Sequence, residues 1–91
     1  MTRTVKVVNE LGLHARAAAK FVHTAARFES HIRVARGSKT MDGKSIMGIL
    51  LLAAARGTTL TISADGVDET NAVDALTQPV ESGFGEESCN A

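Results

Sequence analysis

Three segments of this 91-residue chain alternate apolar and polar side chains, and this alternation restricts the fold more than any other feature. The clearest is TTLTISA at residues 58–64, whose apolar positions are Leu60, Ile62 and Ala64. RTVKVVN at residues 3–9 and HIRVAR at residues 31–36 repeat the pattern. A strand with one apolar face is half-buried, so these segments predict a largely antiparallel sheet with helices on one side and solvent on the other.

The segments between the predicted strands have the apolar spacing of helices. Residues 15–28 place apolar side chains three and four positions apart, at Ala18, Phe21, Val22, Ala25 and Phe28. Gly37-Ser38 predicts a turn into a short strand, Lys39 to Asp42. Ser45 can then cap a short helix from Ile46 to about Ala54.

A final helix follows the turn at Asp65-Gly66. Asp68 can cap this helix, and one of its faces would carry Val73, Leu76, Val80 and Phe84. Pro79 lies inside the same segment and has no amide donor, so it predicts a kink or a helix that ends near Thr77. The predicted order is β-α-β-β-α-β-α, an α+β fold with one domain over residues 1–88 and a short tail, 89–91.

Composition argues against several classes of function. The formal net charge is zero, and the aromatic residues are three Phe with no Tyr or Trp, which argues against a nucleic-acid-binding protein. The histidines at positions 14, 23 and 31 lack the spacing of metal ligands, and no cofactor motif stands out.

Other features suggest a cytoplasmic location. The N-terminal segment MTRTVKVVNE is interrupted by Lys6 and does not predict a signal peptide. The apolar run from Ile49 to Ala55 is too short to cross a membrane. The single cysteine, Cys89, cannot form an internal disulfide, which favours a reducing compartment.

The stretch LGLHARAAAKF, residues 11–21, predicts a helix whose start lacks a usual capping side chain, because Gly12, Leu13 and His14 occupy the candidate positions. Free backbone amides at a helix start, with the positive end of the helix dipole, favour a bound phosphate. An imidazole with an unprotonated ring nitrogen can accept a phosphoryl group, and Arg16 could contact it. From the residues alone, His14 could equally be an ordinary loop histidine and Arg16 a solvated side chain.

The sequence resembles the histidine-containing phosphocarrier protein, HPr, family of the bacterial phosphoenolpyruvate-dependent phosphotransferase system. The motif GLHARAAAKFV places His14 at the family's phosphorylated position and Arg16 at its phosphate-contacting position. GKSIMGI places Ser45 at its regulatory serine, and GTTLTISADG and ESGFGEE are also similar, so the resemblance extends from residue 2 to about residue 87. It implies an open-faced β-sandwich with three helices over a four-stranded sheet.

The resemblance also implies a function. His14 would be phosphorylated on Nδ1 by phospho-Enzyme I and would pass the phosphoryl group to an Enzyme IIA component. The protein would then be a carrier and not an enzyme, a monomer, and a target of a serine kinase at Ser45. Sugar uptake and nitrogen-type regulation both remain open. The alternative is a regulatory docking module that does not depend on phosphorylation of His14.

Two surfaces are candidates for partner docking. On a helical wheel centred on Arg16, three further basic or imidazole side chains fall within about 40° of it: Lys20, His23 and Arg27. This stripe could steer acidic partners or simply be solvated. The segment SIMGILLLAAA has almost no polar face, so we expect part of it to remain exposed for partners, namely Ile46, Met47 and Leu50 or Leu51.

Overall fold

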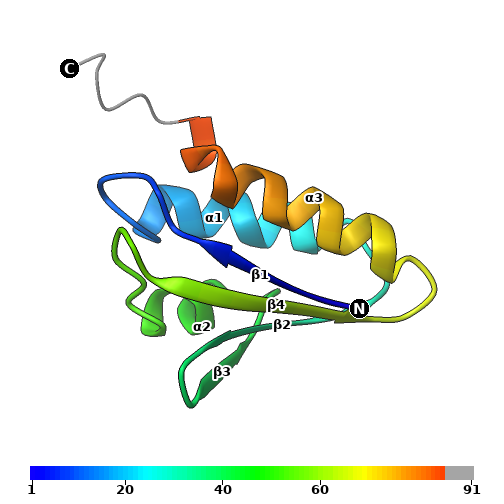
Figure 1. The fold of residues 1–91 in the computed structure, drawn as a ribbon. Coiled ribbons are helices and arrows are strands. Elements are labelled where there is room, and N and C mark those ends of the chain that lie inside the picture. Colours follow the sequence, from blue (N-terminus) through cyan, green and yellow to red (C-terminus); the bar gives the residue numbers. More distant parts are fainter. Residues whose placement is uncertain (86–91) are drawn as a thin grey trace.

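Strands and helices alternate along the chain in the predicted order (Figure 1). The computed structural model describes residues 1–85. Within them lie β1 (Thr2–Lys6), α1 (Ala15–Ala25), β2 (His31–Arg36), β3 (Lys39–Asp42), α2 (Ile46–Leu51), β4 (Thr59–Asp65), α3 (Glu69–Glu81) and a 3-10 turn, η1 (Gly83–Gly85). The end of the predicted domain, the predicted tail and Cys89 lie outside the described residues.

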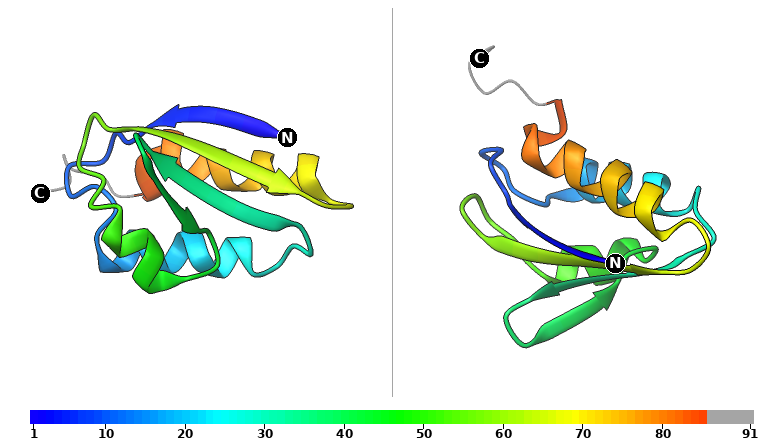
Figure 2. Two further views of the ribbon diagram at one scale, coloured as in Figure 1. Left: turned by 90° about the horizontal axis from the view of Figure 1, so that it is seen from below. Right: turned by 45° about the vertical axis from the view of Figure 1, so that its right-hand side comes forward.

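The strands form one antiparallel sheet in the order β1-β4-β2-β3. Its register pairs Val5 with Leu60 and Val34 with Ile62, which places these apolar side chains on the same buried face. Helices α1 and α3 lie side by side over that face, and α2 packs against α1 and β3 (Figures 1 and 2). The predicted open-faced β-sandwich is confirmed.

The core fills the space between the helices and the sheet. Its largest fully buried side chains include Phe21, Ile32, Ile49, Leu52, Leu60, Ile62 and Leu76. Burying one such side chain contributes roughly 1.5–3 kcal/mol. In β1 and β2 the residues that alternate with the buried Val5, Ile32 and Val34 are exposed or half-buried, which confirms the one-sided strands predicted from the sequence.

Two helices end earlier than predicted. Helix α1 ends at Ala25 and not at Phe28, because the amide of Phe28 donates to Ala25 at 3.2 Å in a tightened 3-10 turn. Helix α2 ends at Leu51 and not near Ala54, because Ala53 adopts a left-handed conformation with φ of 50°.

Helix α3 does not end near Thr77 but continues through Pro79 to Glu81. Pro79 lies in the last turn, and its missing amide removes one helical hydrogen bond, so little helix remains beyond it to be disturbed. Val80, fully buried, holds that turn against the core, and the Ser82 hydroxyl donates to the carbonyl of Pro79 at 3.2 Å. Phe84 is also buried, but it follows the helix in η1 with a left-handed φ of 59°.

Asp68 precedes α3 but does not cap it, contrary to the prediction. Its carboxylate instead accepts hydrogen bonds from the amides of Glu29 and Ser30, at 2.9 and 3.0 Å, and from the buried Ser30 hydroxyl. These bonds, the Ser30 hydroxyl first, lower the pKa of Asp68 below its ordinary value of 3.8. Glu69 supplies the local contact at the helix start by accepting from the amide of Gly66 at 3.2 Å.

We predict that the Asp68 contacts make the fold sensitive to acid. Because the folded pKa lies below the unfolded one, the carboxylate stabilises the fold above about pH 3.8, and this contribution is lost as the pH falls through the folded pKa. Asp68→Asn should therefore be less stable than the parent near neutral pH and lose less stability on acidification.

Urea unfolding of both proteins at several pH values between about 7 and 3 tests this. Asp65→Asn, which removes an exposed carboxylate at the end of β4, is the matched control and should follow the parent. Identical pH dependence in Asp68→Asn and the parent would contradict the prediction.

Candidate functional site

Hydrogen bonds to the segment before β4 and within the loop itself fix the loop between β1 and α1. Val7 exchanges backbone hydrogen bonds with the segment before β4, donating to Thr58 at 2.9 Å and accepting from Gly57 at 2.7 Å. Asn9 is a buried polar residue whose side-chain amide donates to the carbonyl of Gly12 at 2.8 Å, while Gly12 donates back to the Asn9 carbonyl at 3.1 Å. These bonds fix the loop just upstream of His14.

Gly12 and Leu13 then press against the chain that follows α2. The Leu13 amide donates to the carbonyl of Ala54 at 2.9 Å. A Cβ added at Gly12 would lie 2.4 Å from the same oxygen, and the φ of 67° also favours glycine. The backbone immediately before His14 is thus fixed to the end of α2.

His14 itself caps α1, so the prediction of a helix start without a side-chain acceptor was wrong. Its backbone is extended, its carbonyl accepts the first helical bond from Ala18 at 2.7 Å, and its Nδ1 accepts from the Arg16 amide at 3.3 Å. This hydrogen bond turns Nδ1 of the ring, and not Nε2, towards the backbone of the first turn. Nδ1 therefore points at the helix start.

The surroundings of His14 suit an anion. Arg16 is exposed one residue into the helix, and the first turn of α1 contains no acidic residue. Eleven residues of aligned peptide dipoles place partial positive charge at this end. His14 and Arg16 thus lie together at the start of α1, joined through the Arg16 backbone amide.

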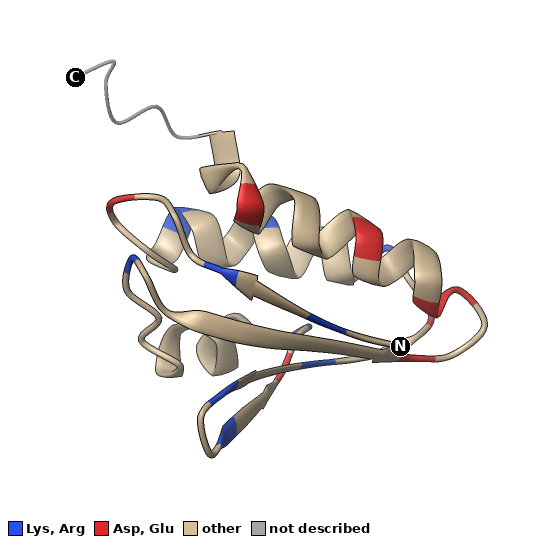
Figure 3. Ribbon diagram, viewed as in Figure 1, with Lys and Arg blue, Asp and Glu red and all other residues tan. Residues whose placement is uncertain are grey.

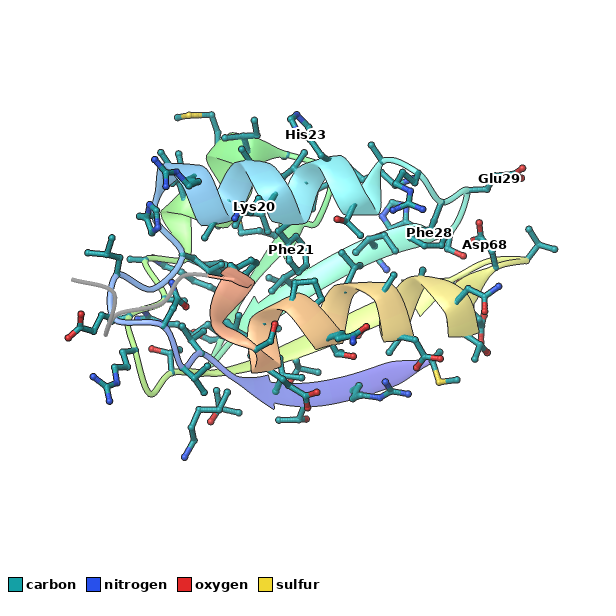
Figure 4. The ribbon with its side chains drawn as sticks, turned by 90° about the horizontal axis from the view of Figure 1, so that it is seen from above. Lys20, Phe21, His23, Phe28, Glu29 and Asp68 are labelled. Carbon is teal, nitrogen blue, oxygen red and sulfur yellow. The ribbon has the colours of Figure 1, made fainter. Side chains whose placement is uncertain are left out.

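The other members of the basic stripe lie along a groove between α1 and α3. Lys20, His23 and Arg27 line this groove, which has a volume of about 690 Å³ and is lined on the α3 side by Gln78 and Pro79, among other residues. Figure 4 shows Lys20 pointing from α1 towards α3. Its ammonium donates to the Phe84 carbonyl at 2.9 Å, a contact that the sequence did not indicate.

Helix α2 places apolar side chains in solvent, as the sequence predicted. Met47 is 66% exposed and Ile46 41%, whereas Leu50 is half-buried and packs on the core. Leu51 is exposed as well, at 55%. Ser45 caps the helix as predicted, its hydroxyl accepting from the Gly48 amide at 3.1 Å.

The zero net charge conceals an uneven distribution (Figure 3). Helix α1 contains Arg16 and Lys20 and no acidic residue, whereas α3 contains Glu69, Asp74 and Glu81 and no basic residue. Basic residues also lie on the hairpin of β2 and β3. An acidic partner is therefore attracted to the α1 side of the molecule.

Residues 1–85 contain neither a cluster of metal-binding side chains nor a helix that could span a membrane. These residues contain no group of three or more His, Cys, Asp or Glu side chains that could hold a metal ion. No helix among them is both long enough and apolar enough to span a membrane.

The chain is similar to known proteins in sequence and in fold. A family model described as "PTS HPr component phosphorylation site" matches residues 1–82. The phosphocarrier protein HPr of Neisseria meningitidis is 44% identical over 86 residues, covering 94% of this chain and 97% of that protein. The relative from Pseudomonas aeruginosa is 45% identical and covers 90% of this chain and 92% of its own.

Solved structures of phosphocarrier proteins have the same fold as this chain. HPr-C-His from Thermoanaerobacter tengcongensis superposes with a TM-score of 0.92 at 46% identity, covering 96% of this chain and 98% of that one. HPr from Bacillus anthracis has a TM-score of 0.85 at 41% identity, covering 88% and 95%. Fold, family model and relatives together show that the chain belongs to the HPr family of the bacterial phosphotransferase system, whose members are phosphocarrier proteins and not enzymes.

Proposed function

We propose that this protein accepts a phosphoryl group on Nδ1 of His14 from phospho-Enzyme I and passes it to an Enzyme IIA component, in sugar uptake or in nitrogen-type regulation. The observation that carries the proposal is the direction of Nδ1, which accepts a hydrogen bond from the first turn of α1. Membership of the HPr family supports the same role.

The contact between Nδ1 and the Arg16 amide suggests how the proposed transfer would proceed. The lone pair on Nδ1 leaves the Arg16 amide and attacks the phosphorus atom of the donor, whose own bond to phosphorus breaks and returns its electron pair to the donor. The amide that held Nδ1 is then available to a phosphoryl oxygen, beside the positive end of the helix. The guanidinium of Arg16 can supply further charge-assisted hydrogen bonds.

The partners would dock on the side of the molecule that carries α1 and α2. The exposed side chains of Ile46 and Met47, with the nearby Leu50, offer an apolar contact, and the basic side chains along α1 attract acidic partners. Methionine adapts its shape readily, which suits one surface that serves several partners.

Ser45 is the proposed regulatory site. A serine kinase would add a phosphate at the start of α2, where the Ser45 hydroxyl now accepts from the Gly48 amide. The added negative charge would repel acidic partners from the adjoining apolar surface.

We infer that the carrier works as a monomer in the cytoplasm, since one surface must meet a donor and an acceptor protein in turn. A solved relative, the HPr dimer from Thermoanaerobacter tengcongensis, is 46% identical to this chain. Light scattering of this protein, at the concentration used in the transfer assays, determines whether it is a monomer or a dimer.

The phosphoryl acceptor is tested by incubating the protein with Enzyme I and phosphoenolpyruvate and measuring its intact mass. We expect one added phosphoryl group that is labile to acid, as a phosphorus–nitrogen bond is, and no addition to His14→Ala. His31→Ala, on β2, is the matched control and should be labelled like the parent. An acid-stable adduct or normal labelling of His14→Ala would refute the carrier proposal, and normal docking of His14→Ala without any labelling of the parent would favour the docking module.

Arg16→Ala should slow transfer without unfolding the protein, because its side chain is exposed. Losing a charge-assisted contact that forms during transfer costs about 1.5–3 kcal/mol, which corresponds to a rate loss of roughly ten- to hundredfold. Rapid-quench transfer assays in both directions measure this loss. Arg56→Ala removes an exposed arginine from the loop after α2 and serves as the control for charge. Equal rates for Arg16→Ala and the parent would show that Arg16 has no role in transfer.

Met47→Asp should weaken Enzyme I binding at least about tenfold, because a carboxylate buried in an apolar interface is desolvated without a counter-charge. Stability should change by less than about 0.5 kcal/mol, because the side chain is 66% exposed. Affinity and melting temperature are measured on the same sample.

Val67→Asp is the matched control for Met47→Asp. Val67 is 87% exposed and belongs to the turn between β4 and α3. That turn lies at the end of the molecule opposite α2 (Figure 1). It should leave Enzyme I binding unchanged. Equal weakening by the two substitutions, or none by Met47→Asp, would remove α2 from the docking surface.

A further inference from the structure

Each backbone carbonyl from the last turn of α2 to the start of the next segment has a hydrogen-bond donor. The carbonyls of residues 49 and 50 accept from the amides of Leu52 and Ala53, and that of residue 51 accepts from the Lys39 ammonium. The Arg36 guanidinium donates to the carbonyls of residues 52 and 53. The carbonyls of residues 54 and 55 accept from the amides of Leu13 and Thr58. Side chains from the β2–β3 hairpin thus cap α2 from outside the helix.

Arg36 makes the central pair of these contacts. Its Nη1 donates to the carbonyls of Leu52 at 2.8 Å and Ala53 at 3.1 Å. Those two carbonyls belong to the peptides on either side of the Ala53 Cα, so both bonds together restrict the φ and ψ of Ala53. Lys39, which faces Arg36 across the hairpin, donates to Leu51 at 3.3 Å, and both cations lie favourably at the negative end of a helix.

Ala53 needs such support. Its φ of 50° is left-handed, a region that an alanine side chain disfavours and that glycine adopts freely. Outside this turn, Phe84 is the other non-glycine residue with a positive φ among residues 1–85. The turn therefore holds a conformation that its own sequence does not favour.

The turn leads directly to the proposed phosphoryl acceptor. The peptide after Ala53 leads to Ala54, a buried residue whose carbonyl accepts from Leu13 at 2.9 Å and lies against Gly12. Leu13 is buried and immediately precedes His14. A rotation of the Ala53 backbone would move the Ala54 carbonyl and release Leu13.

We propose that Arg36 is a positioning residue for His14. By holding both carbonyls that flank Ala53, it fixes the Ala54 carbonyl, which fixes Leu13 and so places the imidazole at the start of α1. Arg36 acts through the backbone and does not touch the phosphoryl group. This inference rests on the proposed acceptor role of His14.

The test combines Arg36→Met with amide hydrogen exchange and phosphoryl transfer. We expect exchange of the Leu13 amide to speed up about tenfold, while the Ile62 amide in β4 exchanges as in the parent, because the opening is local. The rate of phosphoryl transfer should fall roughly three- to tenfold. Arg36→Lys should retain most of both properties, since an ammonium can also donate to two carbonyls.

A second substitution separates positioning from loss of charge. Ala53→Gly in the Arg36→Met background should restore both the Leu13 exchange rate and the transfer rate, because glycine adopts a φ of 50° without strain. It also provides a folded protein if Arg36→Met alone is too unstable to study. Arg33→Met, which removes an exposed cation from the same strand, should leave both rates unchanged.

Several outcomes would overturn the proposal. In Arg36→Met, these are an unchanged exchange rate of the Leu13 amide, or a faster exchange rate with a normal rate of phosphoryl transfer. The others are slow transfer that adding Ala53→Gly does not restore, and an equal loss of transfer rate in Arg33→Met. If the parent takes no phosphoryl group, the proposed function fails by itself. The exchange of the Leu13 amide then still decides whether Arg36 holds this loop.

Discussion

A single backbone contact, the hydrogen bond from the Leu13 amide to the Ala54 carbonyl, ties the residue before His14 to the segment that follows α2. It requires Gly12, because any side chain there would strike the same oxygen. It joins the start of α1 to the end of α2, and Val7 joins this loop to the segment before β4. The proposed phosphoryl acceptor and the exposed apolar side chains of α2 are consequently fixed relative to each other.

The charge distribution makes the two helices that cover the sheet differ in their attraction for an acidic partner. Helix α3 lies beside α1 on the sheet and carries the acidic residues Asp74 and Glu81, whereas α1 carries basic ones. Arg3 pairs with Asp74 at 2.7 Å and reduces the negative charge of α3 only in part. An acidic partner is attracted to α1 and repelled from α3, so a chain with no net charge still orients its encounters.

The sequence predicted those features that depend on neighbouring residues. The strands follow from alternation, and the Ser45 cap follows from a hydroxyl three residues before the amide it accepts from. The cap at His14, which spans only two residues, was missed because imidazole is not a usual capping side chain, and other contacts were missed where distant parts of the chain meet. The Asp68 carboxylate accepts from Ser30, 38 residues away, and not from its own helix. The Arg36 guanidinium donates to the carbonyl of Leu52, 16 residues away at the end of α2. No local pattern encodes which long side chain folding brings to which carbonyl.

The cap at His14 shows why the site departs from local rules. A serine or aspartate at that position would satisfy the helix start better, since these are preferred capping residues. Either would lack a neutral ring nitrogen able to take up and release a phosphoryl group near neutral pH. The imidazole makes a longer contact, 3.3 Å, with the Arg16 amide. A weak cap is easily exchanged for a phosphoryl oxygen, so the helix start keeps an acceptor in both states of the proposed cycle.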